Sequence, residues 1–286
     1  MPPSSAPGTT VTAAAVTHFA GRAGDHNNRA MIASPVLADA LATRLDTVAT
    51  VIGTPESALA ANWDQELAAA LPALQQMSAQ FDQILTQGRV PVTALSRCAV
   101  ALATLPVIAD HRPDAVIVWF DAHADINTPD NTTTGYLGGL ALSGPLGLWE
   151  SGLGSGVLTH NVVLVGARDL DDPEQRLVAA GTIALVPVGP DIASTLRRVI
   201  AGRPVYVHID CDVLDAGVAP TDYLMPDGLS LDQLHACAQA LAESEIVGVE
   251  IGELEAEDDQ HATPQPANLV LDAISPLLQK IKPRRE

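Results

Sequence analysis

A short stretch of alternating acidic and imidazole side chains is the part of this sequence best suited to chemistry. Asp121, His123 and Asp125 follow an uninterrupted apolar run at 116–120, which is typical of a buried parallel strand. Alternate residues of an extended chain point to the same side, so these three side chains can converge on one point. Open α/β sheets place their binding sites in the loops that leave the carboxyl ends of such strands.

A second apolar run, at 205–209, also ends in acids. Asp210 and Asp212 follow it directly, and Asp215 comes three residues later. Two strands that end in paired acids, one of them with a histidine, could together hold two oxygen-loving metal ions. Carboxylate and imidazole ligands suit Mn²⁺, whereas an all-thiolate site would suit Zn²⁺ better. The alternative is that these acids cap helices or close turns, as acids after strands often do.

The two motifs resemble those of the ureohydrolase (arginase/agmatinase) family, which hydrolyses guanidino groups at a binuclear manganese centre. The resemblance runs from about residue 95 to the end of the chain, and residues 121–129 and 210–215 carry it. A closer likeness, to a branch of the family that acts on Nω-hydroxy-L-arginine, is carried by residues 98–106, 134–139 and 222–228. It implies an enzyme that hydrolyses C–N bonds of linear amidines.

The resemblance also implies the ligands of the metal ions. One ion would take Cys98, Asp121, Asp125 and Asp210, and the other would take Asp121, His123, Asp210 and Asp212. Adjacent cations need shared anionic ligands to offset their repulsion, and together they lower the pKa of a bound water so that hydroxide forms at neutral pH. Asp125 is then the expected proton carrier.

Residues that match family positions would hold the two ends of the substrate. Glu253 matches the glutamate that pairs with the guanidino group, and a bidentate carboxylate is the natural partner of that planar fork. Glu250 and Glu255 are weaker candidates for the same role. The amino-acid end would be bound at the α-carboxylate by Asn127 and Thr134 and at the α-amine by Asp171. For Asn127, a turn-making role is the alternative.

Three positions depart from the family pattern. Cys98 replaces the usual metal-binding histidine, and a thiolate could weaken manganese binding or favour another metal, unless Cys98 is only a small buried apolar residue. Gly138 stands in place of the family histidine that shuttles protons, which leaves room for an extra substrate oxygen. Asp222 and Tyr223 replace a Gly-Thr pair in the guanidino pocket, and Tyr223 or Tyr136 could hydrogen-bond an added hydroxyl.

These departures predict hydrolysis of Nω-hydroxy-L-arginine to hydroxyurea and L-ornithine. Hydroxylation makes the guanidino group less basic, so its neutral and more electrophilic form is more available. Such a substrate depends less on general acid–base help, which typically contributes roughly 10²–10⁴-fold. Two alternatives stay open: an arginase or other guanidino-acid hydrolase, and a catalytically weak ligand-binding relative, which the changes at 98 and 138 would explain.

Composition limits the possible partners. The 286 residues carry 34 acidic and 15 basic side chains, a net charge of −19, which argues against a nucleic-acid or anionic-membrane partner. No apolar run reaches the roughly 18 residues of a membrane span. Only three cysteines occur, without a spacing pattern, which indicates a reducing, cytoplasmic compartment. The expected partner is a small amino-acid substrate, and the family resemblance allows a homo-oligomer.

Strand-like and helix-like segments alternate along the chain without internal repeats. We expect strands at 11–16, 48–52, 90–95, 116–120, 162–165, 183–188, 205–209 and 246–251, and helices at 34–45, 63–85 with a kink or restart at Pro72, 99–108, 173–180, 191–200, 230–242 and 268–281. Residues 132–151 should form an active-site loop that leads into a helix. The alternation predicts one three-layer α/β/α domain over 1–286 with a mainly parallel sheet of about eight strands, and a loose tail at about 1–9.

Overall fold

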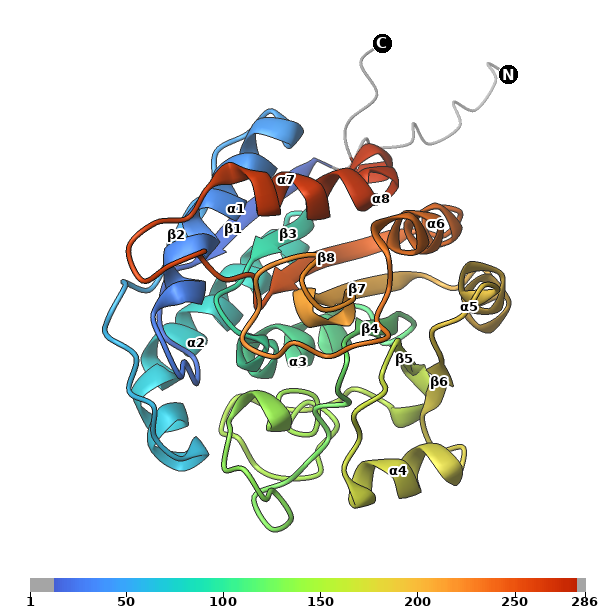
Figure 1. Cartoon of the computed structure of the whole chain (residues 1–286), viewed down its shortest axis with the longest axis horizontal. Coiled ribbons are helices and arrows are strands. Elements are labelled where there is room, and N and C mark those ends of the chain that lie inside the picture. The colour runs from blue at the N-terminus through green and yellow to red at the C-terminus, as the bar shows by residue number, and fades with distance from the viewer. Residues whose placement is uncertain (1–12, 282–286) are drawn as a thin grey trace, which may run out of the picture.

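The computed structural model describes residues 13–281, which are built around one sheet of eight parallel strands (Figure 1). The strands are β1 (Ala14–Phe19), β2 (Thr50–Ile52), β3 (Val90–Ala94), β4 (Val116–Phe120), β5 (Val162–Val165), β6 (Ala184–Val186), β7 (Val205–Asp210) and β8 (Ile246–Gly252). Their order across the sheet is β2-β1-β3-β8-β7-β4-β5-β6, and all neighbours are parallel. Parallel neighbours need long crossovers, which helices provide.

Helices cover both faces of the sheet (Figure 1). They are α1 (Arg29–Leu45), α2 (Trp63–Thr86), α3 (Ala101–His111), α4 (Asp172–Ala179), α5 (Ile192–Ile200), α6 (Leu231–Leu241), α7 (Pro264–Ala273) and α8 (Ser275–Ile281). Side chains of α1, α5, α6, α7 and α8 join the core on one face, and side chains of α2 and α3 join the core on the other. The predicted three-layer α/β/α fold with a parallel sheet is therefore confirmed.

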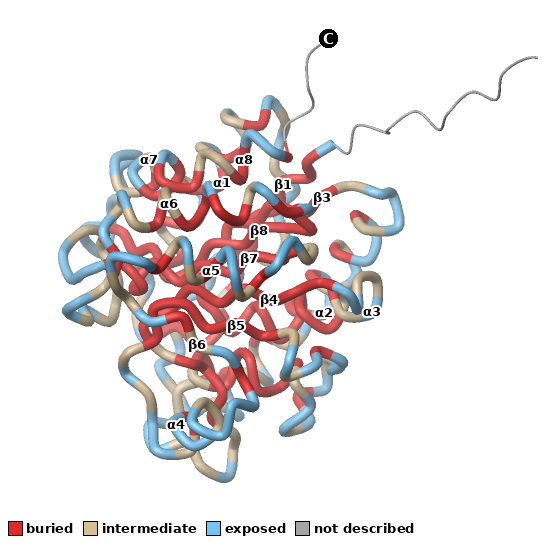
Figure 2. The backbone as a smooth tube through the Cα atoms, turned by 90° about the vertical axis from the view of Figure 1, so that its right-hand side faces the viewer, coloured by how far each residue is buried: buried red, intermediate tan, exposed pale blue. Residues whose placement is uncertain are grey.

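The central strands are apolar on both faces because each face is covered. Val116, Val118 and Phe120 of β4 join one core, whereas Ile117 and Trp119 join the other. All five residues are buried, and Figure 2 shows the central strands of the sheet as buried. A strand packed on both sides reads as a continuous apolar run rather than an alternating one.

The strand register brings the two predicted acidic clusters together. Trp119 on β4 lies opposite His208 on β7, and His208 lies opposite Glu250 on β8. Asp121 and Asp210 come two residues after Trp119 and His208, so they leave the sheet at neighbouring points. The carboxyl ends of β4, β7 and β8 thus form the base of one site.

Two predictions for the amino-terminal region need correction. The first strand begins at Ala14, so the expected span 11–16 starts too early, and residues 11 and 12 lie outside the described residues. Helix α1 begins at Arg29, which places Pro35 inside the helix instead of near its start. The tail predicted at about 1–9 also lies outside the described residues.

Three further predictions need correction, and two of them concern proline. Helix α2 is continuous from Trp63 to Thr86 with Pro72 inside it, so the helix does not restart there. The helix expected at 268–281 is divided into α7 and α8, since Pro276 has no N–H with which to continue the ladder. Residues 132–151 hold one 3₁₀ turn, Gly138–Leu140, and lead into no α-helix. The other elements occur where they were expected, with small shifts at their ends. Among the described helices, none is long and apolar enough to cross a membrane.

Candidate active site

A pocket of about 150 Å³ contains most of the predicted site residues. Those that line it are His123, Asp125, Asn127, Thr134, Tyr136, Asp171, Asp210, Asp212, Tyr223 and Glu253. Cys98 and Asp121 do not line it; they are buried against residues that do. A larger hollow of about 340 Å³ lies around Arg89 and Arg112, near the start of β3, and contains none of the predicted residues.

The first acidic cluster is held by contacts within residues 119–123 and by one contact to Asp212, which follows β7. The indole Nε1 of Trp119 donates to Asp121 Oδ2 at 2.9 Å, and the backbone N–H of His123 donates to Asp121 Oδ1 at 2.6 Å. His123 Nδ1 lies 3.2 Å from Asp121 Oδ1 and 3.1 Å from Asp212 Oδ2. The possible ligand atoms of Asp121, His123 and Asp212 all lie within 4.8 Å of one another, which is close enough to surround one metal ion.

A second possible metal position shares Asp121 with the first. Ligand atoms of Cys98, Asp121 and Asp125 also lie within 4.8 Å of one another. Asp125 has a φ of 55°, in the left-handed region that residues other than glycine rarely adopt. Its backbone carbonyl accepts the N–H groups of Leu142 and Ser143, which hold it in this conformation. Strain of this kind often accompanies functional positions.

Burial is the main reason why the acids of this cluster resist ionisation. It raises the pKa of Asp121, Asp125 and Asp210, and neighbouring carboxylates raise these pKa values further. Burial disfavours the charged form of His123, but its hydrogen bonds to Asp121 and Asp212 outweigh this effect and raise its pKa to about 12. A bound cation would relieve the repulsion among the acids, so the arrangement fits a metal site.

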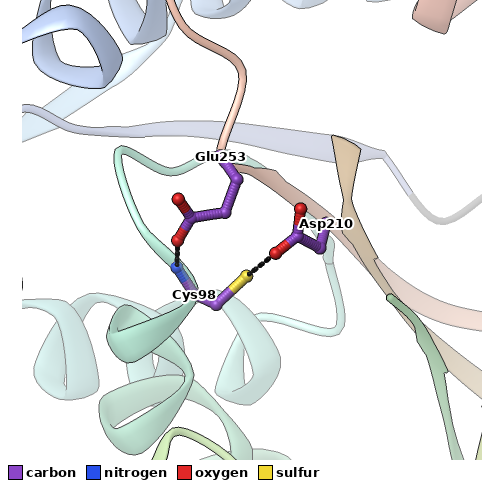
Figure 3. A group of neighbouring side chains, drawn as sticks. All are labelled: Cys98, Asp210 and Glu253. Atoms are coloured by element: carbon purple, nitrogen blue, oxygen red, sulfur yellow. Dashed lines mark hydrogen bonds between the residues drawn. The ribbon is translucent and has the colours of Figure 1, made fainter. Parts of the chain in front are cut away.

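The thiol of Cys98 lies at the centre of the buried polar contacts (Figure 3). It donates to Asp210 Oδ2 at 3.2 Å and lies 3.0 Å from Nε2 of His208, while the backbone N–H of Cys98 donates to Glu253 Oε1 at 2.8 Å. Burial, reinforced by the nearby acids, raises the pKa of the Cys98 thiol. Because only a thiolate binds metal, this cysteine needs a cation beside it before it can act as a ligand.

Glu250 is not available to a substrate, although the sequence left it as a candidate. Its Oε1 lies 2.7 Å from Nδ1 of His208, and its Oε2 accepts the hydroxyls of Tyr206 and Thr104 at 2.6 and 2.9 Å. The imidazole of His208 also stacks on Trp119, with ring centroids 3.5 Å apart. Glu250 therefore supports the residues behind Cys98 instead of lining the pocket.

Glu253 lines the pocket, and both oxygens of its carboxylate already accept a hydrogen bond. Its Oε2 accepts Nη1 of Arg97 at 2.7 Å, and the hydroxyl of Tyr136 lies 3.5 Å from its Oε1. Glu253 also has a left-handed φ of 60°. Glu255 pairs with Arg97 and Arg29 and does not line the pocket. Sequence reasoning missed Arg97, although an arginine within the apolar stretch 90–108 is an unusual feature.

The residues predicted for the amino-acid end of the substrate lie together. Asn127 Nδ2 donates to Asp171 Oδ2 at 2.8 Å, and the buried Oδ1 of Asn127 has no hydrogen-bond partner in the described structure. Thr134 Oγ1 accepts the backbone N–H of Tyr136 at 3.2 Å. Glu174, which sequence reasoning missed, accepts the backbone N–H of Asp171 at 2.9 Å as part of a capping box. The sequence contains the signal for this capping box, because Glu174 follows Asp171 by three residues.

Gly138 and Gly139 both line the pocket, where the sequence suggested room for an extra substrate oxygen. A Cβ atom at Gly138 would overlap the ring of Tyr136, whereas a Cβ at Gly139 would meet nothing within 4 Å. The Tyr136 ring lies 4.4 Å from the ring of His26, and Tyr223 lies 5.2 Å from His123, measured between centroids. The ring of Tyr136 therefore takes up the side-chain space at 138, and the space at 139 is open.

Solved structures with this arrangement of sheet and helices define the class of fold. Arginase from Bacillus subtilis aligns with a TM-score of 0.81 and 19% identity, covering 93% of this chain and 98% of that chain. Proclavaminate amidino hydrolase from Streptomyces clavuligerus aligns with a TM-score of 0.70 and 17% identity, covering 94% and 92%. The fold is thus that of the arginase-like hydrolases.

Sequence comparison identifies the family. The Arginase family model matches residues 37–275, and this chain belongs to the arginase family. The Nω-hydroxy-L-arginine amidinohydrolase of Streptomyces lavendulae is 37% identical over 239 residues, which cover 84% of this chain and 88% of that relative. Arginase from Bacillus caldovelox is 27% identical over 64% of this chain and 67% of the relative. The predicted family resemblance is confirmed.

Proposed function

We propose that this chain hydrolyses the guanidino C–N bond of Nω-hydroxy-L-arginine and releases hydroxyurea and L-ornithine. The observation that carries the proposal is the meeting of an acid cluster and Glu253 in one pocket. The cluster suits cations, and Glu253 suits a planar guanidino group. Similarity to an Nω-hydroxy-L-arginine amidinohydrolase over most of the chain supports this choice of substrate.

The acids and the thiol around the pocket are proposed to hold two divalent ions, best matched by Mn²⁺. One set is Cys98, Asp121, Asp125 and Asp210, and the other is Asp121, His123, Asp210 and Asp212. Oxygen and imidazole donors favour Mn²⁺, and the single thiol makes this preference weaker than a pure oxygen and nitrogen set would. When bound, the two ions supply a hydroxide nucleophile at neutral pH.

The remaining side chains are proposed to orient the substrate and to move one proton. Glu253 accepts N–H groups of the guanidino end and turns its central carbon towards the acid cluster. Asp125 accepts the proton that the attacking water gives up and delivers it to the amine nitrogen of ornithine as the C–N bond breaks. At the other end, Asn127 and Thr134 bind the α-carboxylate, and Asp171 binds the α-amine. The short contact between Asn127 and Asp171 supports a shared role for these two residues.

Substrate preference tests the proposal. We expect kcat/KM for Nω-hydroxy-L-arginine to exceed that for L-arginine by at least about tenfold, since a site that pairs a substrate hydroxyl rejects the analogue that lacks it. Tyr136 and Tyr223 are the proposed partners of that hydroxyl. The measurement is a side-by-side assay of hydroxyurea, urea and ornithine at neutral pH in manganese-saturated enzyme. Equal or better turnover of arginine would identify an arginase instead, and turnover of neither would indicate a ligand-binding relative.

Two properties outside the pocket belong to the same proposal. The three cysteines of the chain are free and buried, which supports a reducing compartment such as the cytoplasm. Assembly into a homo-oligomer is proposed from the family resemblance alone. Neither property affects the chemistry assigned to the pocket.

A further inference from the structure

Arg97 is a fully buried arginine next to the proposed active site. Its side chain has an exposed fraction of 0%, and its three nitrogens contact four carboxylates, the fourth being Asp222 at 3.8 Å from Nη1. Nε donates to Asp25 at 3.0 Å, Nη1 to Glu253 at 2.7 Å and Nη2 to Glu255 at 2.9 Å. A buried guanidinium is costly unless it is paired in this way, so its position must be strongly fixed.

The carboxylates around Arg97 are themselves held in place. Asp25 accepts the backbone N–H of Ala23 at 2.8 Å through its second oxygen. The second oxygen of Glu255 accepts Nε of Arg29 at 2.7 Å. Arg97 follows β3, Asp25 follows β1, and the two glutamates follow β8, so the cluster joins loops from three strands that are adjacent in the sheet. The Arg97 guanidinium is therefore a rigid element of this side of the pocket.

Two fixed donors determine the orientation of the Glu253 carboxylate. Arg97 occupies Oε2, and the backbone N–H of Cys98 occupies Oε1 at 2.8 Å. A carboxylate oxygen can accept more than one hydrogen bond, so each oxygen keeps acceptor capacity for a ligand in the pocket. Figure 3 shows the Glu253 side chain directed towards Cys98, beside Asp210. Glu253 is thus preorganised and already paired with one internal guanidinium.

We propose that Arg97 positions Glu253 and biases the pocket towards a guanidino group in its neutral form. This inference rests on the proposed function, in which Glu253 receives the guanidino end of the substrate. A cationic substrate would bring a second positive charge to a carboxylate that Arg97 already balances, whereas a neutral N-hydroxyguanidine would only donate its N–H groups. Asp25, Glu255 and Asp222 also balance Arg97. Removing the positive charge of Arg97 should nevertheless favour a cationic guanidino group over a neutral one, whatever the total charge of the surrounding acids.

The test compares two variants on two substrates. Arg97→Gln removes the charge, and we expect the ratio of kcat/KM for Nω-hydroxy-L-arginine over L-arginine to fall roughly three- to tenfold. Arg97→Lys keeps the charge but loses the planar fork, so both efficiencies should fall while the ratio stays near the wild-type value. Metal content, measured by elemental analysis, should match the wild type in both variants. An unchanged ratio in Arg97→Gln, or loss of its metal, would overturn the inference.

A second variant covers the case in which Arg97→Gln does not fold. Arg97→Gln combined with Asp25→Asn removes one positive and one negative charge, so fewer unpaired acids remain buried. The same fall in the substrate ratio is expected for the double variant. The matched control is Arg112→Gln, because Arg112 also forks between two carboxylates, of Asp114 and Glu245, but lies outside the pocket. It should leave the ratio unchanged, and an equal fall there would overturn the inference.

Binding of small inhibitors separates this inference from the proposed function. Guanidinium is a permanent cation and hydroxyurea is neutral, so their dissociation constants can be measured by calorimetry without turnover. Arg97→Gln should strengthen guanidinium binding relative to hydroxyurea, and Arg97→Lys should not. If the wild type lacks a preference for Nω-hydroxy-L-arginine, the proposed function fails, and the inhibitor ratio still decides the role of Arg97.

Discussion

Two groups of buried carboxylates lie next to each other at the carboxyl ends of the central strands, and they differ in what balances their charge. Asp25, Glu253 and Glu255 surround the internal guanidinium of Arg97. The other group, the acid cage, consists of Asp121, Asp125, Asp210 and Asp212. Among the ion pairs of residues 13–281, those made by the cage involve only His123, at its edge.

In the first group the negative charge of the acids is balanced by an arginine of the protein itself. The acid cage has no such internal arginine among the described residues, so a bound cation would have to balance its charge. In the cage, burial and mutual repulsion raise the pKa of Asp121, Asp125 and Asp210. Glu253 lies close enough to Cys98 and Asp210 to share a metal ion with them, but it also pairs with Arg97 at 2.7 Å. The internal cation therefore supports the proposed roles, in which Glu253 receives the substrate and the cage holds the metal.

The largest effect is expected from removing a carboxylate that both cation positions share. Asp121→Ala should abolish bound metal and turnover, because residues that merely support metal ligands already contribute roughly 10–100-fold. Metal content by elemental analysis and the product assay measure the two losses. Asp114→Ala, an exposed acid far from the pocket, is the control. A variant that keeps its full metal content would show that the cage is drawn incorrectly.

The next largest effect is expected from the substitution that tests whether Glu253 belongs to the Arg97 group or to the acid cage. Glu253→Gln is expected to keep its metal and lose roughly 10- to 10²-fold in kcat/KM, since hydrogen bonds to charged groups are worth about 1.5–3 kcal/mol. The paired measurement is metal content and steady-state kinetics on the same sample. If metal is lost, Glu253 belongs to the cage and the comparison breaks down.

A smaller effect is expected at the thiol that touches both groups. Cys98→Ser should weaken metal binding at one of two positions by about tenfold, the lower end of the effects seen around metal ligands. Titration with Mn²⁺ under calorimetry would resolve the two binding events. Cys237→Ser, another buried free thiol but on α6, provides the matched control. Equal affinities in all three proteins would make Cys98 an apolar core residue.

The smallest effect on the site is expected from Asp25→Asn, which changes stability rather than chemistry. Burial raises the pKa of Asp25 from 3.8 to about 6, although Arg97 lowers it. Between these values the folded protein binds more protons at Asp25 than the unfolded protein, so this group makes stability fall as pH rises from about 4 to 6. The variant should lose this pH dependence, which changes the free energy of unfolding by about 2–3 kcal/mol at most. Chemical denaturation of the wild type and the variant at pH 4, 5 and 6 measures the free energy of unfolding. The same pH dependence in both proteins would contradict a raised pKa of Asp25.

The acid cage could be predicted from the sequence because its geometry is local. Asp121, His123 and Asp125 follow one apolar run and Asp210 follows another, so the carboxyl ends of neighbouring parallel strands bring them together. The expected strand periodicity does not hold for them, because β4 ends at Phe120 and Asp125 has a left-handed φ of 55°. The Arg97 cluster could not be predicted in this way. Arg97 and Glu253 are 156 residues apart in the chain, and their contact depends on the adjacency of β3 and β8.

The loop at 132–151 was predicted only in part: its residues line the pocket as expected, but the helix expected to follow it does not form. Residues 132–151 contain leucines and a tryptophan that suggest a helix, but Gly135 and Gly147 adopt left-handed φ values of 67° and 72°. A chain that turns at such points cannot continue as a regular helix. The strands of the sheet, by contrast, could be predicted, because a strand that is buried on both faces is apolar along its whole length.

The Tyr136 ring beside Gly138 has a consequence for any exchange at position 138. A Cβ atom there would come within 3.0 Å of the far end of that ring. A larger residue at 138 therefore requires the ring to swing aside, together with the hydroxyl that lies 3.5 Å from Oε1 of Glu253. Position 138 is thus coupled to the Glu253 carboxylate through Tyr136.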